Sequence, residues 1–354
     1  MSVAFDRQLD ALGTHRVIDP PGAMPQSARK IDNTPVAFEN ELLCDVETLN
    51  IDSASFKQIR DHCGNDAARI AEHIMDTVRE RGKQHNPVTG SGGMFIGRIL
   101  KIGERLREKV DLHPGDRIAS LVSLTLTPLY IESVTDLDVE TGRVWIRGKA
   151  ILFESGLWAK LPADIDDDVA LAVLDVAGAP AQVRRMTKPG MTVAVIGADG
   201  KSGMLSCAQA KVQAGPGGCV IGVAPDTGTP AAQALKSAGL VDEFIQADAC
   251  NAIELSQKFA AVAPELADLV VNCVNVPGTE LSSILCTKQN GTVYFFSMST
   301  SFTAAALGAE GVGKDVTMII GNGYAVGHAE CALQTLRDHA GIHRYFNSKY
   351  AGSR

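Results

Sequence analysis

Three glycines at three-residue intervals, Gly197, Gly200 and Gly203, give this sequence its clearest chemical signal. They follow Thr192–Ile196, an apolar and β-branched run that is typical of a parallel strand buried on both faces. Apolar side chains then recur at four-residue steps, as in a helix, at Met204, Ala208 and Val212. Glycines between a strand and a helix let the backbone approach a pyrophosphate, which the amides at the helix N-terminus bind. The predicted pyrophosphate contacts are Gly197, Ala198, Gly200, Lys201, Ser202 and Gly203, with Lys201 adding positive charge.

Strand-like and helix-like stretches alternate through the rest of this region. Apolar runs predict strands at Cys219–Val223, Phe244–Ile245, Leu269–Val274 and Thr292–Phe296. The stretches between them predict helices at Ala231–Ala238, Ala252–Ala261 and Glu280–Thr287. Such alternation is typical of βαβ units, so we predict an α/β fold with a doubly wound parallel sheet. A further strand is expected at Asp315–Gly321 and a helix at His328–His339.

Composition favours a soluble enzyme with two domains. The chain has 354 residues, which exceeds what one core usually supports. It is 45% hydrophobic and 21% charged with a net charge of −8, so nucleic acid is not an expected partner. There is no run of about 18 uncharged apolar residues, and Met1–Asp10 lacks the layout of a signal peptide, so we expect a cytoplasmic protein with no membrane contact. The 8 cysteines contain no Cys-x-x-Cys pair, which argues against disulfides and structural zinc.

The first part of the chain predicts a compact β-rich domain with an inserted helix. Strands are expected at Glu41–Thr48, Gly93–Ile102 and Arg117–Val122. The inserted helix presents one apolar face, formed by Ile70, Ile74 and Val78, and Gly64-Asn65-Asp66 is placed to cap it. A surface helix is favoured over a lid or a subunit contact. We predict a substrate domain at residues 1–165, joined by the C-terminal segment 325–354, and a dinucleotide domain at residues 166–324, which a helical segment from Asp164 to Arg185 introduces.

This order of parts resembles the medium-chain dehydrogenase/reductase superfamily, in which a GroES-like barrel precedes a Rossmann domain. The motifs that carry the resemblance are Leu42–Asn50, Val88–Gly97, His113–Arg117, Lys188–Gly190 and Gly197–Gly203. Other segments are similar to the family of L-erythro-3,5-diaminohexanoate dehydrogenases, namely Gly13–Val17, Glu47–Phe56, Gly82–Gly93, Ala150–Gly156, Asp175–Gln182 and Gly321–Tyr324. The resemblance covers nearly the whole chain. It implies oxidative deamination of (3S,5S)-3,5-diaminohexanoate at C3, in lysine fermentation, to 5-amino-3-oxohexanoate and ammonium.

The sequence departs from the zinc-dependent members of that superfamily at the metal positions. Asp52 stands where those enzymes carry a cysteine, and Gly90-Ser91-Gly92 stands where they carry Gly-His-Glu. Without that thiolate and imidazole, a tetrahedral zinc site lacks two ligands. The resemblance therefore implies a site without metal, in which protein donors such as Ser91 polarise the reacting group.

The tip of the second strand of the dinucleotide domain predicts the cofactor. Enzymes that prefer NAD usually place an acid there to bind the ribose 2′-hydroxyl. Here Ala224 occupies the tip, Asp226 follows two residues later, and we expect no arginine or lysine nearby to hold a 2′-phosphate. We therefore predict NAD, with NADP tolerated. By family resemblance, the ends of later strands approach the ribose and nicotinamide at Val274, Asn275 and Ser297.

Amine oxidation needs a base, and three carboxylates are candidates. Glu154 interrupts an otherwise apolar strand near the expected cleft, although an alternating strand also carries surface carboxylates. Asp52 stands at the lost metal position, or it caps the turn before residues 53–55. Asp175 lies in a segment apolar enough to bury it, which favours the protonated form, but a structural carboxylate is the more common outcome there.

A substrate with one carboxylate and two amines requires a cationic clamp and an acidic partner. Lys83 and His85 enter the loop before Gly90-Ser91-Gly92, and His15 and Arg16 form a second cationic pair. The alternative for each is a solvated loop charge.

Two other functions fit the same scaffold. A zinc-free quinone or enoyl reductase needs an apolar pocket, and the density of Asp52, Lys83, His85 and Glu154 argues against it. A non-catalytic NAD(H)-binding protein is the other alternative, and the sequence leaves it open. We also expect a homodimer or a higher homo-oligomer, since members of the superfamily usually pair through their nucleotide sheets, for which Asp315–Gly321 is available.

Overall fold

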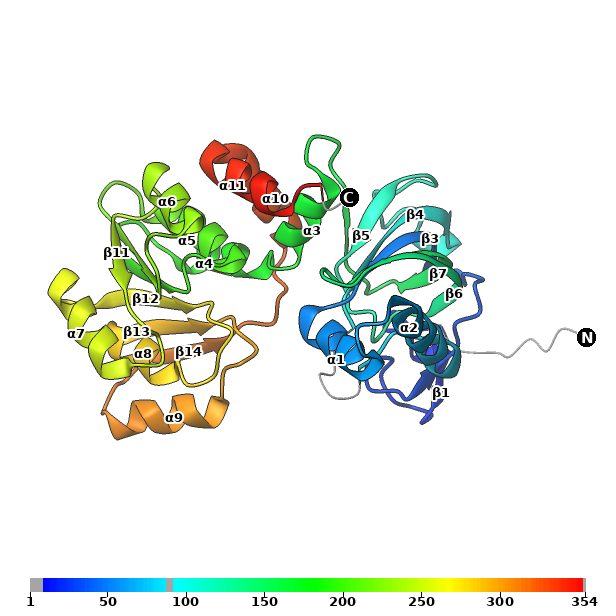
Figure 1. The fold of residues 1–354 in the computed structure, drawn as a ribbon, viewed down its shortest axis with the longest axis horizontal. Coiled ribbons are helices and arrows are strands. Elements are labelled where there is room, and N and C mark those ends of the chain that lie inside the picture. The colour runs from blue at the N-terminus through cyan, green and yellow to red at the C-terminus, as the bar shows by residue number, and fades with distance from the viewer. Residues whose placement is uncertain (1–8, 87–91, 353–354) are drawn as a thin grey trace, which may run out of the picture. The chain divides into compact units, whose positions relative to one another are not determined.

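The computed structural model describes residues 9–86 and 92–352 (Figure 1). Contacts divide the chain into two compact units, unit 1 at Met1–Leu161 and unit 2 at Pro162–Arg354. Ser91, which we predicted as a hydrogen-bond donor, lies outside the described residues. Of the helices in the described ranges, none is long and apolar enough to span a membrane.

Unit 1 is built on a six-stranded antiparallel sheet in the order β6-β7-β3-β4-β5-β8. Its strands are β3 (Glu41–Asn50), β4 (Met94–Ile102), β5 (Arg117–Ser120), β6 (Leu129–Asp138), β7 (Arg143–Phe153) and β8 (Trp158–Lys160). A small antiparallel pair, β1 (Val17–Asp19) and β2 (Lys30–Ile31), precedes it. The register pairs Phe153 with Glu41 and Arg143 with Asn50, so Glu41 and Asn50 mark opposite ends of the β3–β7 pair.

Two helices, α1 (Ser53–Cys63) and α2 (Ala67–Arg81), are inserted between β3 and β4. The predicted cap of α2 is confirmed, because the Asp66 side chain accepts hydrogen bonds from the amides of Ala68 and Arg69. The predicted apolar face is buried in the unit 1 core at Ile70, Ile74 and Val78. The buried face identifies α2 as a helix that covers the sheet.

Unit 2 contains a six-stranded parallel sheet in the order β11-β10-β9-β12-β13-β14. The strands are β9 (Thr192–Ile196), β10 (Cys219–Ala224), β11 (Glu243–Gln246), β12 (Ala267–Asn272), β13 (Thr287–Phe295) and β14 (Thr317–Ile320). From β9 the chain adds β10 and β11 on one side of the sheet. It then crosses to the other side of β9 and adds β12, β13 and β14 there. This order defines a Rossmann arrangement, and ligands bind such sheets where the strand order reverses, outside the carboxyl ends of the strands.

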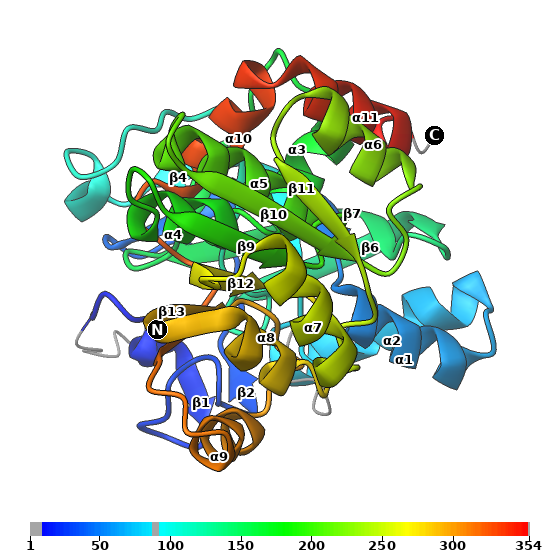
Figure 2. The ribbon, with the colours of Figure 1, turned by 90° about the vertical axis from the view of Figure 1, so that its left-hand side faces the viewer.

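Helices cover both faces of this sheet (Figures 1 and 2). One face carries α4 (Gly178–Met186), α5 (Lys201–Ala214), α6 (Pro230–Ser237), α10 (His328–Asp338) and α11 (Ala340–Tyr350). The opposite face carries α7 (Ala252–Val262), α8 (Glu280–Cys286) and α9 (Phe302–Gly311). A further helix, α3 (Asp167–Leu174), leads into α4. The strands lie between two helical layers, which explains why their sequences are almost continuously apolar.

Contacts divide the chain differently from the domain limits predicted above. The division falls between Leu161 and Pro162, and the segment 325–354 belongs to unit 2. Helix α10 packs against α3, α4 and α5, and α11 packs against α6 and α3. Leu336 of α10 is fully buried, and Gln209 of α5 donates a hydrogen bond to Thr335 at 2.8 Å. The apolar faces of the C-terminal helices are therefore buried within unit 2.

Candidate functional site

The three glycines form a tight turn between β9 and α5, and each has a different steric role. Gly197 has a φ of +81°, which favours glycine. A Cβ on Gly203 would lie 2.0 Å from the carbonyl oxygen of Gly197, so the close packing of α5 on the turn requires glycine there. A Cβ on Gly200 would meet no atom closer than 3.4 Å, so this position borders open space. These are the roles that a pyrophosphate-binding turn assigns to its glycines, so the residues fit a dinucleotide.

Hydrogen bonds within the turn decide which amides remain for a phosphate. The amides of Gly197 and Ala198 both donate to the carbonyl of Val223, at 2.9 and 3.0 Å, and the amide of Gly200 donates to the carbonyl of Gly197 at 3.1 Å. The protein itself therefore uses these three amides, since those of Gly197 and Ala198 bind β10 and that of Gly200 bonds within the turn. The amides of residues 201–203 open α5 and have no partner within the helix. They are the donors that this turn offers to a phosphate.

Asp226 lies in the loop that follows β10, and the side chain of a lysine from α6 reaches the same loop. Oδ1 of Asp226 accepts a hydrogen bond from the amide of Gly228 at 2.7 Å, and Ala224 is buried as the last residue of the strand. Nζ of Lys236 lies 3.4 Å from the carbonyl oxygen of Thr227 and 5.2 Å from the centre of the Phe244 ring. The prediction that no lysine stands nearby is wrong, because the side chain of Lys236 reaches back along α6 to this loop.

The predicted ribose and nicotinamide contacts follow β12 and β13. Val274 adjoins the glycine turn, since a Cβ on Gly197 would lie 3.0 Å from its Cγ2. Oδ1 of Asn275 accepts a hydrogen bond from the Ser299 hydroxyl at 2.9 Å, and the Ser299 amide donates to the hydroxyl of Ser297 at 3.1 Å. The loops after β12 and β13 are thus joined at the carboxyl edge of the sheet.

A buried asparagine organises the first of these loops. Asn272 is fully buried at the end of β12, and its Nδ2 donates to the hydroxyls of Thr279 and Ser283 at 2.8 and 2.9 Å. Its Oδ1 accepts the amide of Val274 at 3.0 Å. Sequence reasoning missed this residue, although an asparagine at the end of an apolar strand was a visible signal. We interpret Asn272 as the group that fixes the course of residues 274–275.

Asp175 lies at the end of α3 and pairs with the first residue of α5. Nζ of Lys201 lies 2.7 Å from Oδ2 of Asp175. The Asp175 side chain is 44% exposed, so the prediction that the apolar segment buries it is wrong. The apolar residues of α3 face the protein, whereas Asp175 caps the helix on its open side. Two groups with different predicted roles, Lys201 in phosphate binding and Asp175 in catalysis, are in direct contact.

In unit 1, three segments meet around the position of Asp52. The Asp52 side chain caps α1 by accepting the amide of Ser55 at 3.0 Å. A Cβ on Gly93 would lie 2.0 Å from the carbonyl oxygen of Asn50, and one on Gly92 would lie 2.7 Å from the carbonyl oxygen of Gln84. The structure therefore brings residues 50–52, 84–86 and 92–93 together. Asn86 connects the group to α1, since its Nδ2 donates to Oε1 of Gln58 at 2.9 Å.

Lys83 and His85 occupy this group of segments in different ways. The Lys83 side chain is fully buried, and its Nζ donates to the carbonyls of Pro25 and Gln26 at 2.6 and 3.0 Å. His85 is half-buried, and its Nδ1 has no hydrogen-bond partner in the described ranges. Burial, together with the charges of Lys83 and Arg81, lowers the pKa of His85 below its ordinary value. His85 therefore remains neutral at physiological pH and does not supply a cation, and the ammonium of Lys83 is held by the backbone.

Burial of Lys83 predicts a pH-dependent stability. Burial, with a smaller contribution from Arg81, lowers the pKa of Lys83 from 10.5 to about 8. Between these pH values the unfolded chain binds more protons than the folded chain, so the free energy of unfolding rises with pH in this window. From pH 8 to pH 10.5, the free energy of unfolding of the wild type should rise by about 2 to 3 kcal/mol relative to that of the Lys83→Met variant. Urea denaturation across this range measures the gain, and a constant difference would contradict the assignment.

Glu154 lies away from this group of segments. It follows Phe153, which pairs with Glu41, whereas Asp52 follows the opposite end of β3 at Asn50. Oε1 of Glu154 forms a salt bridge with Nζ of Lys109 at 2.5 Å. The structure therefore does not bring Glu154 together with Asp52, and it pairs Glu154 with a lysine of unit 1 instead.

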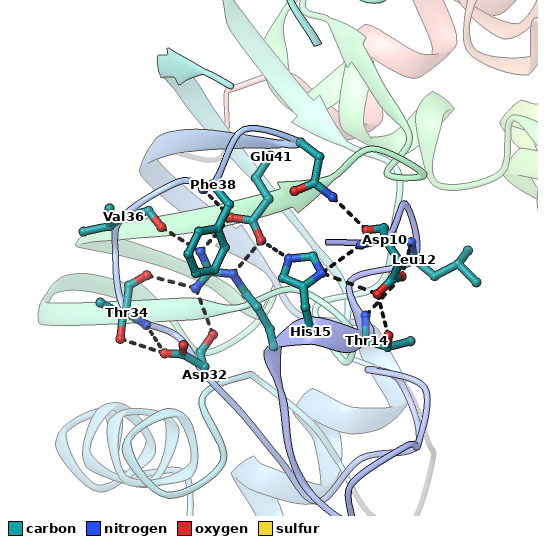
Figure 3. A network of polar contacts seen from close by, with 11 residues as sticks. Asp10, Leu12, Thr14, His15, Asp32, Thr34, Val36, Phe38 and Glu41 are labelled. Carbon is teal, nitrogen blue, oxygen red and sulfur yellow. Dashed lines mark hydrogen bonds and ion pairs between the residues drawn. The ribbon is translucent and has the colours of Figure 1, made fainter. Parts of the chain in front are cut away.

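His15 and Arg16 also lie at the Glu41 end of β3, in a buried polar network (Figure 3). Nε and Nη2 of Arg16 bind the two carboxylate oxygens of Glu41, each at 2.6 Å, and Nε2 of His15 lies 2.8 Å from Oε1 of Glu41. The remaining guanidinium donors bind the carbonyls of Asp32, Thr34 and Val36. All five Arg16 donors are used, so the prediction that this pair clamps a substrate carboxylate is not supported by its geometry.

The same network shifts the ionisation of Glu41. Burial acts to raise the pKa of this carboxyl, but the hydrogen bonds from Arg16 and His15 outweigh it and hold the pKa below its ordinary value. Glu41 is therefore ionised at neutral pH and balances the buried guanidinium. The network attaches the N-terminal segment to β3.

Within residues 9–86 and 92–352, no group of three or more His, Cys, Asp or Glu side chains is arranged to hold a metal ion. All eight cysteines are free thiols.

Comparisons with known proteins agree over most of the chain. Residues 15–162 match the family described as the L-erythro-3,5-diaminohexanoate dehydrogenase N-terminal domain. A protein of Acetoanaerobium sticklandii named L-erythro-3,5-diaminohexanoate dehydrogenase is 55% identical over 96% of this chain and 98% of its own length. A protein of the same name from Fusobacterium nucleatum is 51% identical over the same shares.

Solved structures agree on the fold. A mycobacterial protein complexed with NADPH superimposes with a TM-score of 0.53 at 17% identity, covering 92% of this chain and 86% of that chain. At this identity the likeness concerns the fold alone. The predicted fold class, a β-rich domain followed by a Rossmann domain, is confirmed.

Proposed function

The chain belongs to the family of L-erythro-3,5-diaminohexanoate dehydrogenases, and we propose that it oxidatively deaminates (3S,5S)-3,5-diaminohexanoate at C3 with NAD in lysine fermentation. The observation that carries this proposal is the 55% identity over 96% of the chain to a protein of that name. The products are (S)-5-amino-3-oxohexanoate and ammonium. The chain is thus an oxidoreductase that uses a nicotinamide cofactor.

Main-chain donors of unit 2 would hold the cofactor. The amides of residues 201–203 would bind the pyrophosphate at the N-terminus of α5, and Asp226 would bind the adenosine ribose beyond β10. Asn272 fixes the loop that carries Val274 and Asn275, which would border the nicotinamide. When bound, the nicotinamide accepts the hydride that leaves C3 of the substrate.

The protein's own part in the reaction is to move protons. The C3 ammonium must first lose a proton to a base, so that a neutral amine can release the hydride from C3 and leave an iminium ion. Water then adds to C3 and ammonium departs, which leaves the ketone. We assign the base to Asp175, which adjoins the glycine turn through Lys201. Asp52 and neutral His85 remain our candidates for binding the polar groups of the substrate.

Polarisation of the reacting group is proposed to come from protein donors without zinc. The support is the residue set, since Asp52 and Gly90-Ser91-Gly92 replace two ligand-bearing positions of zinc-dependent relatives. A purified enzyme incubated with synthetic 3,5-diaminohexanoate and NAD+ should produce NADH equally well with and without EDTA. Loss of activity in EDTA that zinc restores would contradict the metal-free proposal. A turnover confined to quinones, or cofactor binding without turnover, would favour one of the two alternative functions.

The loop after β10 predicts a preference between cofactors. The carboxylate of Asp226 should repel a 2′-phosphate, whereas Lys236 contributes some attraction, so kcat/KM should favour NAD+ by about tenfold while NADP+ remains usable. Lys236→Met should lower kcat/KM for NADP+ alone. Lys258→Met is the matched control, because Lys258 already pairs with Glu254. A tenfold preference for NADP+ would overturn the assignment of Asp226.

We further propose a homodimer formed through β14. This strand is at the edge of the parallel sheet, and its Ile320 is 65% exposed. An unpaired edge with an exposed apolar residue is suited to pairing with a second copy.

Eight free thiols support a reducing compartment, so we propose a cytoplasmic location.

A further inference from the structure

The contact between Lys201 and Asp175 joins two helix ends whose charges are each unfavourable alone. Asp175 follows the C-terminus of α3, where the partial negative charge of the helix repels a carboxylate. Lys201 opens α5, where the partial positive charge of the helix repels an ammonium. Their contact at 2.7 Å offsets both effects. The side chains are 31% and 44% exposed, so a small molecule can reach them.

We propose that Lys201 is a positioning residue for Asp175, the carboxylate that receives the proton of the substrate ammonium, and that it is not a phosphate ligand. This inference rests on the proposed function and changes the role that the glycine motif predicts for Lys201. A lysine held by a carboxylate contributes little net charge to a neighbouring phosphate site, because the pair is close to neutral. The amides of residues 201–203 would then bind the pyrophosphate without the Lys201 side chain.

Arg337 and His328 lie on α10, which packs against α3, and both have partners other than Asp175. Arg337 forms a salt bridge with Asp164 at 2.9 Å, and the ring of His328 contacts the ring of Tyr324 edge to face. On α11, the charge of His343 acts on Asp164. In the part of the chain that the structure describes, Lys201 is therefore the cation that contacts Asp175.

The proton transfer is balanced without a further reactant. Asp175 would accept a proton from the C3 ammonium, and the nitrogen would keep the electron pair of the broken N–H bond. That pair forms the C=N bond as the hydride leaves C3. Lys201 keeps its protons throughout, and its ion pair with Asp175 holds the accepting carboxylate in place.

The test separates cofactor binding from catalysis in Lys201→Met and Lys201→Arg. For Lys201→Met, we expect the Kd for NAD+, measured by calorimetry without substrate, to change less than about twofold. We expect kcat to fall about tenfold or more, because the carboxylate loses the contact that holds it in place. Lys201→Arg should restore kcat, because a guanidinium can also pair with the carboxylate. Asp175→Asn should lower kcat at least about a hundredfold at an unchanged Kd.

A matched control lies on the same helix. Lys211 of α5 forms a salt bridge with Asp242, and Lys211→Met should leave both Kd and kcat unchanged. A tenfold rise of the Kd in Lys201→Met with an unchanged kcat would overturn the inference and make Lys201 a phosphate ligand. Unchanged kcat in Lys201→Met, with an active wild type, would also overturn it. A wild type that binds NAD+ but does not oxidise the diamino acid would instead overturn the proposed function.

Discussion

Replacing Gly203 with alanine is expected to weaken NAD+ binding at least about a thousandfold, an effect of about 4 kcal/mol. The added Cβ would lie 2.0 Å from the carbonyl oxygen of Gly197 and 2.8 Å from Cα of Ala198. The turn cannot move away cheaply, because the amides of Gly197 and Ala198 both bind the carbonyl of Val223. The start of α5 must therefore shift, and the amides of residues 201–203 shift with it. Equilibrium titration with NAD+ measures the loss.

Gly308 supplies the matched control for this experiment. It also lies within a helix of unit 2, α9. A Cβ there would meet its nearest neighbours, one methyl group of Ile284 and one of Leu281, at 3.6 Å. Gly308→Ala should therefore leave the Kd for NAD+ unchanged, and it should not destabilise the helix, because alanine is the better helix former. A Gly203→Ala variant that binds NAD+ like the wild type would show that α5 does not hold the pyrophosphate.

Replacing Arg16 with methionine is expected to lower the free energy of unfolding by about 3 to 5 kcal/mol. The change leaves the buried Glu41 carboxylate without its bidentate partner. Three backbone carbonyls also lose the hydrogen bonds that Arg16 donates to them. Because the pKa of Glu41 lies below its ordinary value, the contribution is present at neutral pH and disappears as acid protonates Glu41. Urea denaturation at neutral and acid pH measures both effects.

Arg79 provides the comparison, because it is also an arginine paired with a carboxylate. It contacts Asp76 on the exposed side of α2, and both side chains are more than half exposed. Arg79→Met should cost less than about 1 kcal/mol. Equal losses in the two variants would show that burial of the Arg16 network does not matter. If kcat falls in Arg16→Met while the unfolding transition is unchanged, Arg16 binds substrate after all.

The parts of the fold that the sequence predicts well are those with a strong local pattern. The run Thr192–Ile196 predicts a strand with the observed bounds, because the four residues after Thr192 are apolar and buried, as in a sheet covered on both faces. The face of α2 was predicted from three apolar residues at four-residue steps, and its N-cap from Asp66. In each case neighbouring residues carry all the information that is needed.

Elements without an apolar stripe were missed. The sequence of α1, Ser53–Cys63, is mostly polar, and the helix depends on the cap from Asp52 and on Phe56 and Ile59, which join the unit 1 core. Helix α9, Phe302–Gly311, is rich in alanine and glycine and presents no clear amphipathic pattern. Tertiary packing decides both helices.

The candidate site was harder to predict than the fold, because its contacts join distant residues. Glu154 and Asp52 are both acidic and both follow strands, and the β3–β7 register alone places them at opposite ends. Arg16 has the same local sequence whether it faces a substrate or Glu41, which lies 25 residues away. Likewise, nothing near Asp226 in the sequence indicates Lys236, whose side chain reaches the loop from α6.

The stoichiometry of the reaction tests the central claim most directly. Enzyme purified in EDTA and supplied with (3S,5S)-3,5-diaminohexanoate and NAD+ should release one ammonium ion and one 5-amino-3-oxohexanoate for each NADH formed. Both products can be determined in the same sample by mass spectrometry and an ammonium assay. The absence of NADH and ammonium, in an enzyme that binds NAD+ and is fully folded, would contradict the account.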